Sequence, residues 1–251
     1  MKEIFLIGLF LIYVSQTGCT NNAQQKNSNR DNEFVSQGLN EVADNDSVYN
    51  HSIELFKKLI KKPDDKRYYA LENTFLYADI PSELLLYSLV AANKFGVEVA
   101  TIRVASYISE SLSNPNVGKN TKTISLYYLK KWASKTKHKR AKQIIEIFDS
   151  LPTNDRGIIV PMINYKSTEI QRLKVGSLKG SIEDYEKLKE RMFKTKKYAF
   201  LLYYAYIMAD RYNYLSANKD VVTIINRFYK EYHLSPIDKD TKYFCSFFQD
   251  Q

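Results

Sequence analysis

The sequence contains little cysteine, histidine, glycine and proline. Its 251 residues include 2 Cys, 3 His, 8 Gly and 6 Pro. Two cysteines cannot build the disulfide framework of a small secreted domain, and three histidines offer few metal ligands. The shortage of glycine and proline argues against an all-β chain, which needs many special turns. At 44% hydrophobic and 26% charged, the composition is globular, which excludes a wholly disordered chain.

Common catalytic and cofactor-binding motifs are also missing. The chain has no CxxC, HExxH or GxSxG motif, and no phosphate-binding or dinucleotide-binding loop. His51, His138 and His233 lie far apart in the sequence. The acidic pairs stand at predicted helix starts, where they cap backbone amides. We therefore expect no enzyme, no metal site and no cofactor, and we expect Cys245, in an aromatic segment, to be a buried, inert thiol.

The N-terminus has the features of an export signal. Residues 4–14 form an apolar run of 11 residues, which has the length of a secretory signal and is shorter than the roughly 20 residues of a spanning helix. The run leads into the segment SQTGC at residues 15–19. Alternatives are an ordinary signal peptide with an incidental cysteine, or an uncleaved anchor.

The segment at residues 15–19 resembles the lipobox of bacterial lipoproteins, including those of Bacteroidetes-type bacteria. In that family the signal is removed before the cysteine, which then carries the lipids. The resemblance implies a signal peptide over residues 1–18 and lipidation of Cys19. Residue 20 is Thr and not Asp, which by the enteric sorting rule favours the outer membrane. Residues 19–48 then form a polar, flexible tether with too few apolar residues to fold.

Apolar residues at helical spacing continue through the rest of the chain. They predict helices over residues 50–62, 64–78, 81–95, 98–113, 121–134, 139–149, 167–175, 181–194, 196–212, 216–233 and 238–248. Residues 150–166 contain two prolines and the run Ile158 to Val160, which indicates a long connection with a short strand at most. The predicted class is all-α.

The two parts of this helical region repeat each other at an offset of 117 residues. The offset aligns Tyr68 with Tyr185, Leu71 with Leu188, Tyr87 with Tyr204, Ala92 with Ala209, Asn93 with Asp210, and Ala100 with Ala217. After a further shift of three residues, Thr121 aligns with Thr241. Small residues let two helices approach closely, and long apolar and Tyr residues fill the groove beside them.

The repeated pattern resembles degenerate tetratricopeptide and Sel-like repeats. The resemblance implies stacked antiparallel helical hairpins in a tetratricopeptide-like solenoid. We expect one repeat unit over residues 49–150, a connector over 151–177 and a second unit over 178–251. Chance similarity between two generic helical pairs is the alternative.

The strongest charge feature lies at residues 130–142, which hold seven Lys or Arg and no acidic residue. These residues are Lys130, Lys131, Lys135, Lys137, Lys139, Arg140 and Lys142. Such a patch binds phosphates or other anions. Trp132 within it could stack on a sugar or base. The other interpretation is a helix end with solvated lysines and with Trp132 in the core. The 20 Tyr residues similarly fit packing between helices or a binding surface.

Together these patterns predict a membrane-anchored, non-enzymatic helical protein that binds another protein. An acidic partner would complement the chain's net charge of +9. An envelope scaffold and an immunity lipoprotein that occludes a toxin both fit. Nucleic acid is not expected, because an exported lipoprotein rarely meets it. Capture of a glycan or nutrient at the cell surface is the alternative function.

Overall fold

The computed structural model describes residues 46–78, 80–109, 119–151, 153 and 168–249. These residues form eleven α-helices and two short 3₁₀-helices. In chain order they are α3 (Asp46–Lys61), α4 (Asp65–Tyr77), η1 (Pro81–Leu84), α5 (Leu85–Asn93), α6 (Glu98–Ser109), α7 (Lys119–Ala133), α8 (Ala141–Ser150), α9 (Glu169–Leu178), α10 (Ile182–Lys194), η2 (Tyr198–Leu201), α11 (Leu202–Tyr212), α12 (Leu215–Glu231) and α13 (Lys239–Ser246).

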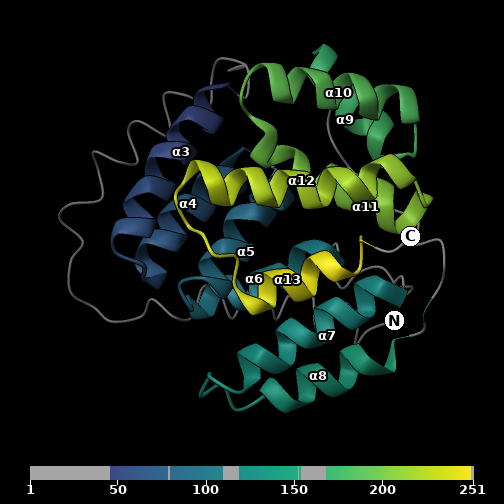
Figure 1. The fold of residues 1–251 in the computed structure, drawn as a ribbon. Helices are drawn as coiled ribbons and strands as arrows, with labels where there is room; N and C mark the ends of the chain where they lie inside the picture. The colour runs from purple at the N-terminus through teal and green to yellow at the C-terminus, as the bar shows by residue number, and fades with distance from the viewer. Residues whose placement is uncertain (1–45, 79, 110–118, 152, 154–167, 250–251) are drawn as a thin grey trace.

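The predicted all-α class is confirmed. Helices that follow one another in the sequence pack as antiparallel pairs, as a helical repeat stack requires. The pair α9/α10 lies at one end of the molecule in Figure 1, and the pair α7/α8 lies at the other end. Helix α8 makes its main contacts with α7. The α7/α8 hairpin is therefore the outermost part of this end of the fold.

Local sequence signals account for most helix boundaries. Asp64, Ser181 and Asp238 are N-caps, and each accepts a hydrogen bond from the backbone amide three residues later. Thr168 and Gln171 form a full capping box that the sequence analysis did not identify. The first helix begins at Asp46, inside the expected tether, and the helix expected over 196–212 is divided into η2 and α11.

The repeat offset is reproduced in the structure. Helices α10 and α12 start 117 residues after α4 and α6, and η2 and α11 start 117 residues after η1 and α5. Helix α9 ends 117 residues after α3 ends, so it is the counterpart of α3 although it begins within the expected connector. The central part of that connector, with the expected short strand, lies outside the described residues.

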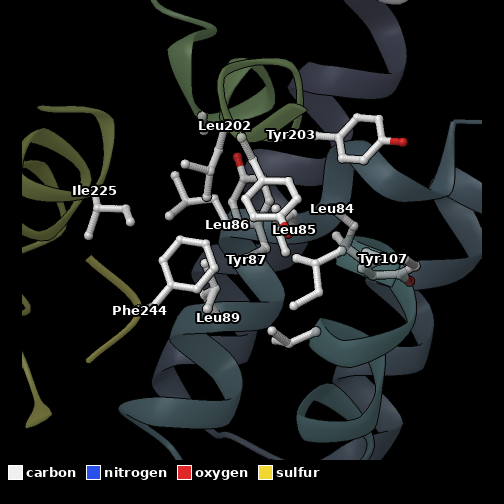
Figure 2. Packing of buried hydrophobic residues seen from close by; sticks show 14 of the residues in the cluster. Leu84, Leu85, Leu86, Tyr87, Leu89, Tyr107, Leu202, Tyr203, Ile225 and Phe244 are labelled. Carbon is white, nitrogen blue, oxygen red and sulfur yellow. The ribbon is translucent and has the colours of Figure 1, made fainter. Parts of the chain in front are cut away.

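The two halves contact each other reciprocally. Helix α5 touches its counterpart α11, and η1 touches its counterpart η2. In addition, α5 contacts η2 while η1 contacts α11. The contact of α5 with η2 and the contact of η1 with α11 are the same contact with the two halves interchanged. Such reciprocal contacts are typical of a two-fold, isologous arrangement. Figure 2 shows this contact, with Leu84–Leu86 of the first half near Leu202 and Tyr203 of the second.

Hydrogen bonds repeat this exchange between the halves. In the first half Asn93 donates to Thr241 Oγ1 of α13, at 3.1 Å. In the second half the aligned residue Asp210 accepts from Thr121 Oγ1 of α7, at 2.6 Å. Helix α7 of the first half and helix α13 of the second therefore each lie against the other half. The two alignments found in the sequence, Asn93 with Asp210 and Thr121 with Thr241, become two equivalent contacts in space.

Candidate functional site

The basic segment lies at the end of the α7/α8 hairpin. Six of its seven basic side chains are exposed, and we call this surface the basic tip. The residues of the basic tip are Lys130, Lys135, Lys137, Lys139, Arg140 and Lys142. Lys142 makes only a long contact of 3.8 Å with Glu146 on the same helix, with both side chains exposed. An exposed pair of this kind contributes little, so Lys142 stays accessible to an anion.

Lys131 is the exception among the seven. Its Nζ lies 2.6 Å from Oδ2 of Asp240 and donates to Oδ1 of Asn93 at 2.9 Å. Tyr127 donates to the other carboxylate oxygen of Asp240 at 2.6 Å. Burial alone would raise the pKa of Asp240, but the bonds from Lys131 and Tyr127 outweigh it and lower that pKa. Lys131 thus ties the C-terminal helix to α5 and α7.

Trp132 belongs to the core. Its side chain is only 3% exposed, and its ring lies 5.9 Å from the ring of His138. The face of this ring is therefore not available to stack on a sugar or a base. The structure thus decides between the two interpretations of Trp132 left open by the sequence. Most tyrosines of the predicted clusters, among them Tyr68, Tyr128 and Tyr206, are also buried between helices.

The sequence offered few catalytic candidates, and the structure places several of them in structural roles. Cys245 is 4% exposed, and burial first, with the Asp238 carboxylate second, raises the pKa of its thiol to about 12. A thiol with that pKa is unreactive at neutral pH. Asp64 and Asp238 cap helices through the amides of Arg67 and Thr241, as expected. Within the described ranges no group of three or more His, Cys, Asp or Glu is arranged to hold a metal ion.

The signal peptide, Cys19 and nearly all of the predicted tether lie outside the described residues. Across the part of the chain that is described, no helix is both long and apolar enough to cross a bilayer.

A buried charge cluster, which the sequence analysis did not find, joins the two halves. The Glu83 cluster consists of Glu83 from η1, Lys174 from α9, Tyr49 from α3 and Tyr204 from α11. Lys174 Nζ lies 2.6 Å from Glu83 Oε1, with the two side chains 4% and 2% exposed. Tyr49 and Tyr204 donate to the same carboxylate at 2.6 and 2.7 Å. Every polar partner of the carboxylate thus comes from a different element.

Two further ion pairs occupy equivalent places in the two halves with opposite charge. In the first half Glu72 of α4 pairs with Arg103 of α6 at 2.5 Å. At the aligned positions Lys189 of α10 pairs with Asp220 of α12 at 3.1 Å. The first pair is the more buried of the two. One pair joins α4 to α6 and the other joins their counterparts α10 and α12, so the interaction is kept although its sign is reversed.

A cavity of about 510 Å³ opens between α3, η2 and the end of α12, and we call it the aromatic pocket. Its lining is mainly aromatic and aliphatic, with three lysines, one glutamate and one histidine. The lining residues are Asn50, Ile53, Lys57, Ile60, Tyr87, Thr195, Lys196, Lys197, Tyr198, Ala199, Phe200, Phe228, Glu231, Tyr232 and His233. The volume lies in the range of small-molecule sites, and the lining divides into aromatic and aliphatic side chains on one hand and seven polar or charged ones on the other.

Comparison of the chain with protein-family models, with curated proteins and with solved structures finds no match. The class that the structure supports is therefore an all-helical domain of about 11 helices packed as sequential pairs.

Proposed function

We propose that the protein is a lipid-anchored helical repeat lipoprotein of the cell envelope that binds another protein and catalyses no reaction. Cys19 would carry the lipids, and two or three acyl chains hold a protein firmly on a bilayer. The paired helices would be a degenerate tetratricopeptide- or Sel-like repeat. Stacked repeats of this kind commonly serve as binding surfaces.

The observation that carries this proposal is the basic tip. It gathers six exposed cationic side chains at the outer end of the α7/α8 hairpin. A surface of one charge steers and orients an acidic partner during association. An envelope scaffold and an immunity protein that occludes a toxin would both use such a surface. The glycan alternative has less support, because Trp132, the ring expected to stack on a sugar, is buried.

The direct test is a pull-down from native membranes with the tagged full chain, identified by mass spectrometry. We expect one stoichiometric acidic protein, whose identity separates the scaffold from the immunity role. The variant Lys130→Gln/Lys137→Gln/Lys139→Gln should lose that protein. The matched control Lys58→Gln/Lys61→Gln/Lys62→Gln removes the same charge from exposed lysines at the end of α3 and should retain it. Equal recovery with both variants, or no protein above background at low salt, would contradict the proposal.

The anchor has a separate test. Replacing Cys19 with Ala should move the protein from the membrane fraction to the soluble fraction, because the lipids are lost. A Cys19→Ala protein that still sediments with membranes after a carbonate wash would refute lipidation at this position.

A further inference from the structure

The aromatic pocket and the Glu83 cluster are equivalent places in the two halves. At the repeat offset of 117 residues, Lys174 corresponds to Lys57, and Tyr204 corresponds to Tyr87. The third pair of positions differs in charge, because the counterpart of Glu83 is the uncharged Phe200. All three counterparts, Lys57, Tyr87 and Phe200, line the aromatic pocket. The pocket therefore retains the cation and the phenol that hold a carboxylate in the cluster, but it lacks the carboxylate.

The hydroxyl of Tyr87 is left without a partner by this exchange. Tyr204 donates to Glu83 at 2.7 Å. Tyr87 is 1% exposed and lines the pocket, and its hydroxyl has no hydrogen bond to any of the residues that the structure describes. The hydroxyl is not among the fully buried polar atoms that lack a partner, so it keeps accessible surface at the pocket and is able to donate to an acceptor that enters there.

The exposed side chain of Lys57 can exchange its weak ion pair for a ligand. Among the described residues its one ion pair is with Glu54, one turn earlier on α3, at 2.7 Å. Both side chains are at least half exposed, and such a pair contributes little. The lining contains three lysines, Lys57, Lys196 and Lys197, and one acidic residue, Glu231. The Glu231 carboxylate accepts a hydrogen bond from the hydroxyl of Tyr198. The charge around the pocket therefore favours an anion.

The remaining lining selects an apolar body. Phe200 and Phe228 are fully buried side chains of the lining, and Ile53, Ile60 and Tyr232 are partly exposed on it. A cavity of about 510 Å³ has room for a small organic molecule, and its apolar surface rewards the transfer of hydrocarbon from water.

We propose that the aromatic pocket binds a small organic carboxylate with an apolar or aromatic body. The carboxylate of the ligand takes the place that Glu83 has in the cluster, where it accepts from Lys57 and Tyr87. The apolar body lies against the partly exposed Ile53, Ile60 and Tyr232. This inference does not depend on the basic tip, so loss of protein binding would leave it standing.

The test uses two probes that differ only in the charged group, 4-phenylbutyrate and its neutral amide 4-phenylbutyramide, in calorimetric titrations of the purified full chain. We expect the carboxylate to bind about tenfold more tightly than the amide. Lys57→Gln should weaken the carboxylate by about tenfold and bring it close to the amide. The matched control Lys58→Gln changes the next, exposed lysine of α3, which does not line the pocket, and should bind as the unchanged chain does.

Tyr87→Phe provides a second variant that removes only the unpartnered hydroxyl and keeps the buried ring. It should fold normally and weaken 4-phenylbutyrate more than the amide, because a hydrogen bond to a charged acceptor is stronger than one to a neutral carbonyl. The proposal is overturned if neither probe binds, if both bind equally, or if Lys57→Gln and Lys58→Gln bind the carboxylate alike.

Discussion

In the first half of the molecule η1 supplies Glu83 to a sealed charge cluster, whereas in the second half η2 supplies Phe200 to an open pocket. Helices α5 and α11 start, and helices α3 and α9 end, at the same repeat offset, and they carry a tyrosine and a lysine at equivalent positions. The exchange of Glu83 for Phe200 therefore separates a structural site from a candidate ligand site, and the position of Tyr49 differs too, because its counterpart is Lys166. The comparison shows that two halves with the same helix packing can differ in whether the equivalent lysine and tyrosine share a buried carboxylate.

The ion pair between α4 and α6 and the ion pair between α10 and α12 also show that equivalent positions of the two halves can carry different residues. Glu72 and Arg103 exchange sign with Lys189 and Asp220 at aligned positions. The geometry of the helices thus fixes where a pair of opposite charges is needed, but not which helix carries which charge. The Glu83 position differs from these ion pairs, because its counterpart Phe200 carries no charge.

Breaking the sealed cluster should have the largest effect. Lys174→Met leaves the Glu83 carboxylate buried without its cation, which typically costs about 3–5 kcal/mol of unfolding free energy. At the equivalent position Lys57→Met removes a half-exposed side chain and should change that free energy by no more than about 0.5 kcal/mol. Urea denaturation of the two variants measures the difference. Similar losses for both would mean that the two sites are not the distinct environments described above.

Two glycines that end helices should differ by a smaller amount. Gly96 and Gly180 both have positive φ, of 70° and 86°, which costs an Ala residue about 1–2 kcal/mol. A Cβ at Gly180 would also lie 2.5 Å from Cε1 of Tyr212, whereas at Gly96 the nearest atom is Lys135 Nζ, at 3.8 Å. Gly180→Ala should therefore lower the midpoint of thermal unfolding more than Gly96→Ala. The reverse order would show that the Tyr212 ring moves aside freely.

The smallest expected effect concerns the aligned pair Asn93 and Asp210. Burial raises the pKa of Asp210, so its contribution to stability is present at low pH and is lost as the pH rises through that pKa. Asp210→Asn copies the first half and still accepts from Thr121. It should be more stable than the unchanged chain at pH 8, by at most about 1 kcal/mol, and lose this advantage at acid pH.

Urea denaturation over a pH series measures this difference for Asp210→Asn, and Asp149→Asn, an exposed residue of α8, serves as a control for the loss of one charge. A stability difference that does not vary with pH would contradict the burial of a charged Asp210.

Much of the fold could be predicted from the sequence, because its signals are local. Apolar spacing and the acidic residues at helix starts located the helices to within a few residues, and the repeat offset placed their counterparts. The pairing of Glu83 with Lys174 could not be predicted, since the two are far apart in sequence and a buried charge has no local pattern. The same holds for Lys131, which the sequence grouped with the basic tip although Asp240 holds it inside.

The reciprocal contact of the two halves is the central feature of the molecule, and disulfide trapping tests it most directly. In a chain with Cys19→Ala and Cys245→Ser, the pairs Asn93→Cys/Thr241→Cys and Thr121→Cys/Asp210→Cys should each form a disulfide on mild oxidation, detected by mass spectrometry of the linked peptides. The crossed pair Thr121→Cys/Thr241→Cys, which joins residues of separate contacts, should not. Linkage of the crossed pair, or of only one of the two aligned pairs, would contradict the two-fold relation between the halves.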